Sequence, residues 1–519
     1  MTEPHVDSVN ARAYRVPTKG PEADGTLAWD ATTIVVVRVH AGGIVGLGWT
    51  YADAACVPLI EHTLAPLVVG QPVVHVPARW QAMQRGIRNL GRPGLVSCAL
   101  SAVDIALWDA AARVMDVPVS TLLGRVHDTV ALYGSGGFTT QSETELAKLL
   151  HAWVHDRRIP RVKIKIGESW GGAVDRDLAR VYVARDVIGE QAELYVDANG
   201  GYSVGQARRV ARRLEDHDVH WFEEPVSSDD LAGLATVRAA TGIDVTAGEY
   251  GYDLPYSARM VGSVDCLQVD VTRCGGFTEW RRVAAVAGAA NLEVSAHCAP
   301  NVSAHAAVAT QNMRHLEWFA DHDRIETEFF DGVLDPTGGE VRPDPATPGL
   351  GLTLKEPDVE KWAVCPEWAV WRTAPTRRRT AGSGGLRRLA VTEGEHDWVV
   401  PVLGVAGPGE CSSRIGPSTV GATSHFRAAA ASRTACHATW CVACSHHDQM
   451  VSTVGRRVRG HHGTERPAGQ VPVKEELPQD RRTVRFQEGS RAAVRGSAPR
   501  RLHPALRLPT AGGLREVRG

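Results

Sequence analysis

Three segments ending in acidic residues recur at equal spacing in this 519-residue chain. They end at Asp197, Glu223 and Glu249, so each acid follows the previous one by 26 residues. One strand, one helix and two short loops take about that length, which predicts repeating βα units. In a closed parallel barrel the C-terminal ends of successive strands meet at one mouth. We therefore expect the three carboxylates to converge.

Converging carboxylates repel one another strongly unless a cation lies between them. All-oxygen ligands favour a hard ion, with Mg²⁺ first and Mn²⁺ or Ca²⁺ after it. The spacing therefore predicts a metal site built from Asp197, Glu223 and Glu249, with Mg²⁺ as the cofactor.

A lysine pair lies in the apolar segment 161–166, one unit earlier. Alternation places Lys163 and Lys165 on one face of a strand. Helices cover the outer face of a barrel, so both lysines are expected to point to the lumen. Two neighbouring ammonium groups near a cation predict a lowered lysine pKa, suited to a general base. The alternative is an edge strand with solvated lysines.

Further strand ends continue the series at Asp270, His297 and Glu317. An Asp and a His at neighbouring strand ends can hydrogen-bond, which orients the imidazole and stabilises its protonated form. Glu317 ends an eighth candidate strand and can donate or share a proton with a substrate oxygen. A purely structural carboxylate is the alternative for Glu317.

The chain divides into four parts by pattern. Residues 1–125 predict an α+β capping domain, with strands at 34–39 and 44–49 joined at Gly42-Gly43 and a helix over 97–115. Residues 126–335 alternate short apolar strands with amphipathic helices, which predicts an α/β fold of the (β/α)8 barrel type. Residues 336–364 are expected to end in a strand at 350–354 and to return to the capping domain. The expected strands are 130–134, 161–166, 192–197, 219–223, 244–248, 264–269, 292–297 and 314–319, and the clearest helices are 175–188, 205–216, 229–240 and 277–290.

Residues 365–519 differ in kind from the rest. Arginine is abundant there, Lys474 is the only lysine, and neither asparagine nor tyrosine occurs. This composition is typical of GC-rich DNA read in an unintended frame, so we interpret the segment as a frameshifted, read-through or disordered tail. The alternative is a small zinc module. Its ligands would come from Cys411, Cys436, His437, Cys441, Cys444, His446 and His447.

Overall composition gives no reason to expect a nucleic-acid or membrane partner. The net charge is −2, the pI is about 6.9, and no apolar run long enough to span a membrane is evident. A polar N-terminus without a secretory signal predicts a cytoplasmic protein, and scattered cysteines are expected to be free thiols. Gly46 and Gly48 lack the context of a phosphate-binding loop.

The combined pattern resembles the enolase superfamily, and within it the mandelate racemase subgroup. The resemblance covers about residues 1–364, including Ser-Ala-Val-Asp-Ile-Ala-Leu-Trp-Asp at 101–109, and the tail has no counterpart in it. The muconate-lactonizing branch carries a lysine near the sixth strand, and Asp270 and His297 argue against that branch.

The resemblance implies a role for each strand-end residue. The metal ligands would be Asp197, Glu223 and Glu249. Lys165 would be one base, and Lys163 would face the substrate carboxylate. The Asp270–His297 pair would act on the opposite face, with Glu317 as a hydrogen-bonding acid.

The expected chemistry is removal of the proton alpha to a carboxylate, giving an enediolate. We expect an acid-sugar dehydratase, with a racemase or epimerase of a 2-hydroxy acid as the alternative. A barrel that has lost catalysis and acts as a binding protein is the alternative of another class. Family members commonly form dimers or octamers, so a homo-oligomer is expected. Mobile capping loops at 17–30 and 49–53 are expected to cover the site, and the substrate-binding candidates are Trp29, Tyr51 and Arg273.

Overall fold

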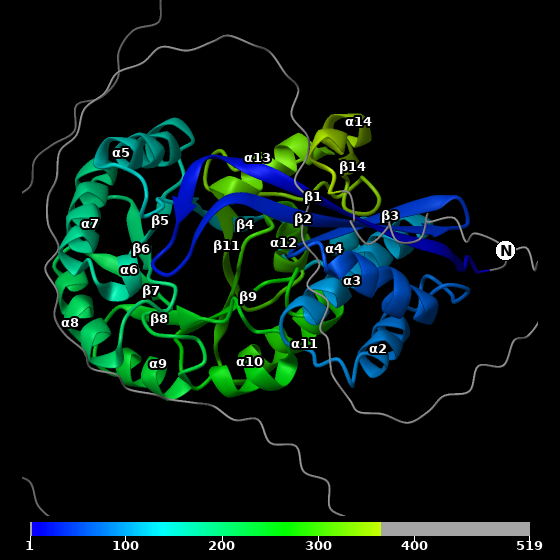
Figure 1. The fold of residues 1–519 in the computed structure, drawn as a ribbon, viewed down its shortest axis with the longest axis horizontal. Coiled ribbons are helices and arrows are strands. Elements are labelled where there is room, and N and C mark those ends of the chain that lie inside the picture. Colours follow the sequence, from blue (N-terminus) through cyan, green and yellow to red (C-terminus); the bar gives the residue numbers. More distant parts are fainter. Residues whose placement is uncertain (1–2, 365–519) are drawn as a thin grey trace, which may run out of the picture. The chain divides into compact units, whose positions relative to one another are not determined.

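The computed structural model describes residues 3–364 of the chain (Figure 1). The interpretations of residues 365–519, including the zinc module, fall outside the described residues. The described part forms a barrel and a capping domain within one compact unit.

Eight parallel strands close into a barrel, because the last strand pairs with the first. This confirms the predicted (β/α)8 fold, and the strands and helices expected for the barrel agree with the observed ones to within two residues at each end. The strands are β4 (Val130–Gly136), β5 (Arg161–Lys165), β6 (Glu193–Asp197), β7 (Val219–Glu223), β8 (Asp244–Ala247), β9 (Cys266–Val269), β10 (Glu293–Ala296) and β11 (Met313–Phe319).

Helices surround the barrel on its outer side (Figure 1). Their inward faces bury apolar side chains against the strands, as in α8, where Ala207, Val210 and Leu214 are buried. The helices are α5 (Glu143–His151), a π-helix (Ala152–Asp156), α6 (Glu168–Gly171), α7 (Val174–Ile188), α8 (Val204–Glu215), α9 (Leu231–Arg238), α10 (Leu254–Met260), α11 (Gly276–Ala289), α12 (Pro300–Ala307) and α13 (Ala320–Phe329).

The capping domain is an antiparallel sheet backed by helices. Its strands β1 (Val6–Ala23), β2 (Ala28–Ala41) and β3 (Ile44–Tyr51) pair in chain order, and β2 turns into β3 at Gly42-Gly43 as predicted. Strand β1 was missed, because Pro17, Gly20 and Pro21 interrupt its pattern. The remaining elements are α1 (Cys56–Leu59), a π-helix (Ile60–Leu64), a 3₁₀ helix (Ala65–Leu67), α2 (Val76–Gly86), α3 (Leu95–Val114) and α4 (Val119–Leu123).

The two long strands β1 and β2 carry their connecting turn to the mouth of the barrel (Figure 1). The expected loop at 17–30 is therefore mostly strand, with a turn only at 24–27, and Trp49–Tyr51 belongs to β3. The tip docks closely at Gly25, where an added Cβ would lie 2.6 Å from the carbonyl oxygen of Ile166. Only glycine permits this approach of the two backbones.

Helix α3 is long and apolar enough to cross a membrane, which the sequence analysis did not anticipate. In the structure, 89% of the most apolar 18-residue stretch of this helix is buried inside the protein. Its composition is therefore explained by packing between the capping sheet and the barrel.

The chain end returns to the capping domain through a short pair of strands, β12 (Phe330–Asp331) and β14 (Thr353–Leu354). Only these last two residues of the expected 350–354 strand are extended. Strand β13 (Glu340–Val341) pairs with β4, and α14 (Glu356–Val359) with a 3₁₀ turn (Glu360–Trp362) ends the described chain.

One buried carboxylate joins these segments. Asp109 of α3 accepts hydrogen bonds from the backbone N–H of Leu47 (2.7 Å) and of Leu350 (2.6 Å), and from Nε of Arg113 (2.8 Å). It thereby connects the capping sheet, α3 and the returning chain. Three donors depend on this one side chain.

Replacing Asp109 by alanine should lower the free energy of unfolding by about 2–5 kcal/mol, because it removes the acceptor of two buried N–H groups and of the partly exposed Arg113 guanidinium. Chemical denaturation of Asp109→Ala measures this change. The matched control is Asp186→Ala on the exposed face of α7, which should stay within about 0.5 kcal/mol of the unaltered protein. Equal effects in the two variants would contradict the role of Asp109.

Candidate metal centre and active site

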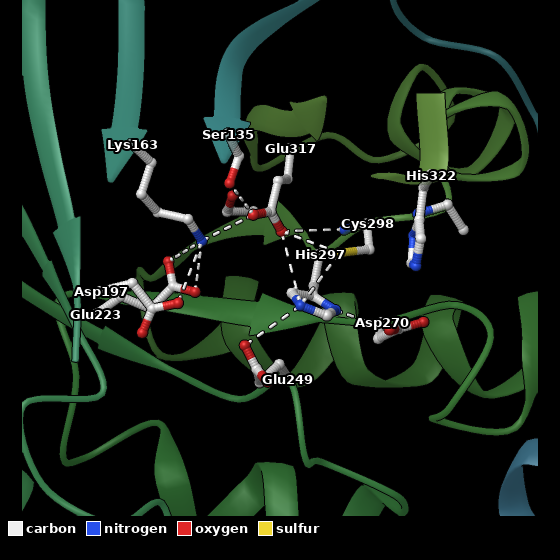
Figure 2. Close-up of polar contacts among 12 residues, drawn as sticks. Ser135, Lys163, Asp197, Glu223, Glu249, Asp270, His297, Cys298, Glu317 and His322 are labelled. Carbon is white, nitrogen blue, oxygen red and sulfur yellow. Dashed lines mark hydrogen bonds and ion pairs between the residues drawn. The ribbon is translucent and has the colours of Figure 1, made fainter. Parts of the chain in front are cut away.

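The three evenly spaced carboxylates converge at the mouth of the barrel. Asp197 and Glu223 end β6 and β7 and are paired in register, and Glu249 follows β8 by two residues. All three are buried, and one oxygen of each lies within 4.8 Å of the others. The structure thus brings together the residues predicted as metal ligands (Figure 2).

The donor set fits a hard divalent cation. It offers carboxylate oxygens alone, from three rigid strand ends. A fourth acid, Glu224, is also buried beside them, and its Oε1 has no hydrogen-bond partner. Burial, followed by the repulsion of Asp197, raises the pKa of Glu223 to about 8. The local excess of negative charge is what a bound Mg²⁺ would neutralise.

Both lysines of β5 point into this cluster, as predicted from the alternation. Nζ of Lys163 lies 2.6 Å from Glu223, 2.9 Å from Glu317 and 3.8 Å from Asp197, and Lys165 is hydrogen-bonded to Asp197 (Figure 2 shows Lys163). The two ammonium groups therefore partly compensate the carboxylates.

Neither lysine pKa is lowered in the metal-free structure, and the lowering expected beside a bound cation stays a prediction. Burial is the largest single effect and lowers the pKa of Lys165, but the carboxylates of Asp197, Glu249 and Glu223 together raise it by more, so the pKa lies above its usual range. The same balance holds for Lys163, with Glu223 as the strongest opposing charge. The prediction assumed a cation bound among the carboxylates of the next strands, and without it those carboxylates act on the lysines directly.

Asp270 and His297 form the expected hydrogen-bonded pair, just after β9 and β10. Nδ1 of His297 lies 2.8 Å from Oδ2 of Asp270, whose Oδ1 accepts from N and Oγ1 of Thr272 at 2.7 Å each. Nε2 lies 3.2 Å from Glu249. Burial lowers the pKa of His297, but the surrounding acidic groups raise it by more, so the imidazole favours its protonated form.

Glu317 faces the lysine side of this pair. Its Oε1 accepts from Oγ of Ser135 at 2.6 Å and lies 2.9 Å from Nζ of Lys163, while its Oε2 accepts from the backbone N–H of Cys298 at 3.2 Å. Burial raises its pKa, but Lys163 and His297 lower it by more, so the pKa lies below its usual range. Without substrate Glu317 is therefore a hydrogen-bond acceptor, and the expected donation or sharing of a proton with a substrate oxygen stays a prediction.

The three substrate-binding candidates are engaged with other protein groups. Arg273 lies 3.4 Å from both Glu249 and Asp270. Tyr51 stacks on His322 with ring centroids 3.4 Å apart, and Trp29 donates to Glu22 at 3.0 Å. Their contact with substrate stays a prediction.

Sequence reasoning missed several residues of the site. Ser135 lies in register with Lys163, so strand alignment was a usable signal. Glu224 and Cys298 directly follow predicted site residues, yet adjacency alone does not show that they turn inward. His322 and Glu326 lie on α13, and nothing in the spacing of strands points to them.

Glu326 connects the capping domain to the barrel. It accepts from Oη of Tyr51 (3.0 Å), Nε1 of Trp49 (3.3 Å) and Nδ2 of Asn301 (2.7 Å). Burial raises its pKa to about 7, because these donors compensate only part of the lost hydration.

The comparisons with known proteins identify the family. The N-terminal domain model of mandelate racemase / muconate lactonizing enzyme matches residues 9–124, and the enolase C-terminal domain-like model matches residues 145–359. A mandelate racemase/muconate lactonizing enzyme-like protein from Rubrobacter xylanophilus is 46% identical, with a TM-score of 0.68 over 70% of this chain and 100% of that one. The chain belongs to this family of the enolase superfamily.

Relatives within the family are lyases and isomerases. The 3,6-anhydro-alpha-L-galactonate cycloisomerase of Streptomyces coelicolor is 30% identical, over 60% of this chain and 88% of its own length. The D-galactonate dehydratase of Ralstonia nicotianae is 31% identical, over 64% and 92%. A racemase from Streptomyces coelicolor A3(2), solved with bound magnesium, is 29% identical with a TM-score of 0.65, over 69% and 100%. Membership supports a Mg²⁺-dependent lyase or isomerase.

Mg²⁺ should raise the melting temperature of the protein, and the rise should vanish in Asp197→Asn. A ligand at about 100 times its Kd stabilises the folded state by about 2.7 kcal/mol. Thermal melts with and without Mg²⁺ measure the effect. The exposed Asp175→Asn of α7 is the control and should keep the full shift. An undiminished shift in Asp197→Asn would place the metal elsewhere.

Stability should fall as the pH rises through the range in which Glu326 ionises. A carboxyl whose folded pKa is raised binds more protons when folded, so its stabilising contribution is complete below about pH 4.5 and is lost as the pH passes about 7. Glu326→Gln should remove up to roughly 3 kcal/mol of that fall in urea denaturation. Exposed Glu328→Gln, on the same helix, should leave the pH profile unchanged. A profile of Glu326→Gln identical to that of the control would contradict the assignment.

Proposed function

We propose that this protein is a Mg²⁺-dependent acid-sugar dehydratase. The substrate would be a small sugar acid with a proton and a hydroxyl on adjacent carbons. Removal of the α-proton and loss of the β-hydroxyl as water would give a 2-keto acid. The proposal is supported by the relatives, two of which carry dehydratase and cycloisomerase names for sugar acids.

One observation carries the proposal: a lysine and a histidine reach the same carboxylate cluster from separate parts of the barrel wall. Lys165 ends β5, and His297 follows β10, with β4 and β11 between them on the shorter side. A substrate held at the cluster would have Lys165 on one side and His297 on another. That placement permits removal of one proton and delivery of a second.

Each residue would have a distinct role in the reaction. Bound by Asp197, Glu223 and Glu249, Mg²⁺ would supply positive charge that stabilises the negative charge developing on the substrate carboxylate. Lys163 would add a second positive charge there. Glu317 pairs with the Lys163 ammonium and is itself held by a hydrogen bond from Ser135.

The proton transfers balance between two residues. With Asp197, Glu223 and Glu249 engaged by Mg²⁺, Lys165 would lose the charges that raise its pKa. Its uncharged form would then take the α-proton, and a new N–H bond would form at Nζ as the C–H bond breaks. His297 would give its Nε2 proton to the β-hydroxyl, which leaves as water. Asp270 orients the imidazole through Nδ1 and favours the protonated form needed for this step. The enol product then becomes the keto acid without a further group.

Racemisation or epimerisation is the second candidate, because the same two residues can exchange protons with one carbon. The similarity to the solved racemase from Streptomyces coelicolor A3(2) supports this second candidate. The two reactions differ only in whether a β-hydroxyl lies beside His297.

Single substitutions separate the two activities. With D-galactonate as the first probe, in D₂O and Mg²⁺, Lys165→Ala should lose both α-proton exchange and keto-acid release. His297→Asn should keep exchange while keto-acid release falls by at least about 10²-fold, because the leaving group has lost its acid. Proton NMR follows the exchange, and a keto-acid assay follows the product. The control is His220→Asn, an exposed histidine of β7 that should leave both unchanged.

The outcome of a wider panel of sugar acids tests the whole scheme. Inversion at the α-carbon with no keto acid would favour the racemase. Absence of exchange with every acid sugar, in a protein that still binds Mg²⁺, would favour a barrel that only binds its ligand.

A further inference from the structure

A second group of potential metal ligands lies beside the carboxylate cluster. Sγ of Cys298 is 3.3 Å from Nε2 of His297 and 3.4 Å from Oε2 of Glu317, and these last two atoms are 3.7 Å apart. All three side chains are buried (Figure 2). They include a thiol and an imidazole, which the three-carboxylate site lacks.

The three distances match one face of a zinc tetrahedron. Zn²⁺ binds sulfur at about 2.3 Å and nitrogen or oxygen at about 2.0–2.2 Å, so the ligand atoms of a tetrahedral site lie about 3.3–3.6 Å apart. The observed triangle is within a few tenths of an ångström of that shape. Three protein ligands with an open fourth position are the usual arrangement of an accessible zinc site.

Other contacts already orient the ligands of this triangle. Nδ1 of His297 is held by Asp270, which leaves Nε2 as the coordinating atom, as in carboxylate–histidine–zinc arrangements. Oε1 of Glu317 is held by Ser135 and Lys163, which directs Oε2 toward the thiol. The backbone N–H of Cys298 donates to the same Oε2. Little reorganisation is needed for the three atoms to receive an ion.

The two ligand sets select different metals. Carboxylates alone suit Mg²⁺, whereas thiolate with imidazole selects Zn²⁺ and other softer ions. The sets are adjacent, since Nε2 of His297 is also 3.2 Å from Glu249. An ion in one site would therefore affect the chemistry of the other.

We propose that His297, Cys298 and Glu317 form a second, zinc-selective site that switches the enzyme off. Binding replaces the S–H bond of Cys298 with an S–Zn bond and releases that proton to solvent. It also displaces the Nε2 proton of His297 to solvent, so the imidazole keeps only its Nδ1 proton toward Asp270 and has no proton to deliver. Binding stands on geometry alone, whereas the inhibition rests on the proposed function.

Co²⁺ is a spectroscopic substitute for Zn²⁺ that distinguishes the two sites. The full chain is first saturated with Mg²⁺ to occupy the carboxylate site, and is then titrated with Co²⁺. We expect one equivalent to give a thiolate-to-cobalt charge-transfer band and the intense visible bands of tetrahedral coordination. Zn²⁺ should then displace these bands. The readout needs no substrate, so its outcome is independent of the proposed activity.

Variants assign the band to this triangle and not to another thiol. Cys298→Ser and His297→Asn should each lose one equivalent of the thiolate-cobalt signal. The control Cys56→Ser, a buried thiol of the capping domain, should keep it. Retained Mg²⁺-dependent thermal stabilisation shows that each variant is folded. An unchanged cobalt signal and stoichiometry in folded Cys298→Ser would overturn the site.

Inhibition is tested separately with Zn²⁺ in the keto-acid assay. Micromolar Zn²⁺ should abolish keto-acid release by the Mg²⁺-loaded protein, and a chelator should restore it. Full activity at a Zn²⁺ concentration that displaces cobalt would overturn the switch while leaving the binding site intact.

Discussion

Repulsion among buried carboxylates at the barrel mouth is the constraint on which the rest of the structure depends. Six acids are buried there, facing four groups that can carry positive charge. With all of them ionised, two negative charges remain, which one divalent cation balances. Without it, the protein relies on raised carboxyl pKa values and on the two lysines of β5. The acids are Asp197, Glu223, Glu224, Glu249, Asp270 and Glu317, and the cationic groups are Lys163, Lys165, Arg273 and His297.

The capping domain excludes water from the site and thereby strengthens the electrostatic interactions among these charges. The tip of the β1–β2 hairpin docks on the loops after β5 and β6 through Gly25, and Trp170 N–H donates to the Gly25 carbonyl at 2.9 Å. Lys163 and Lys165 keep only 1% and 6% of their surface exposed. In such a low-dielectric site each ion pair is stronger than in water, and so is each uncompensated charge.

The strand-end residues Asp197, Glu223 and Glu249 were predictable from the sequence because a barrel repeats one unit. Residues that are equally spaced along the chain therefore lie at the same level of the barrel, at its mouth. The protonation states were not predictable, because carboxylates on neighbouring strands, Asp197 first among them, raise the pKa of Lys165. Spacing along the chain does not reveal how close each carboxylate lies to the ammonium group. Glu326 could not be predicted from the sequence for a related reason, because its partners Trp49 and Tyr51 belong to a separate domain.

Backbone strain marks the same end of the barrel. Among the described residues, Asn199, Glu224, Cys298 and Ala299 follow strand ends with positive φ between 37° and 50°, although none is glycine. Left-handed conformations of such residues cost about 1–2 kcal/mol each, and they persist only where surrounding contacts enforce them. Here they turn the chain sharply after β6, β7 and β10, so that the strand-end side chains face inward. The strained backbone thus costs stability while it brings like charges together. A cation at the mouth would relieve the repulsion among the carboxylates and would leave the backbone strain in place.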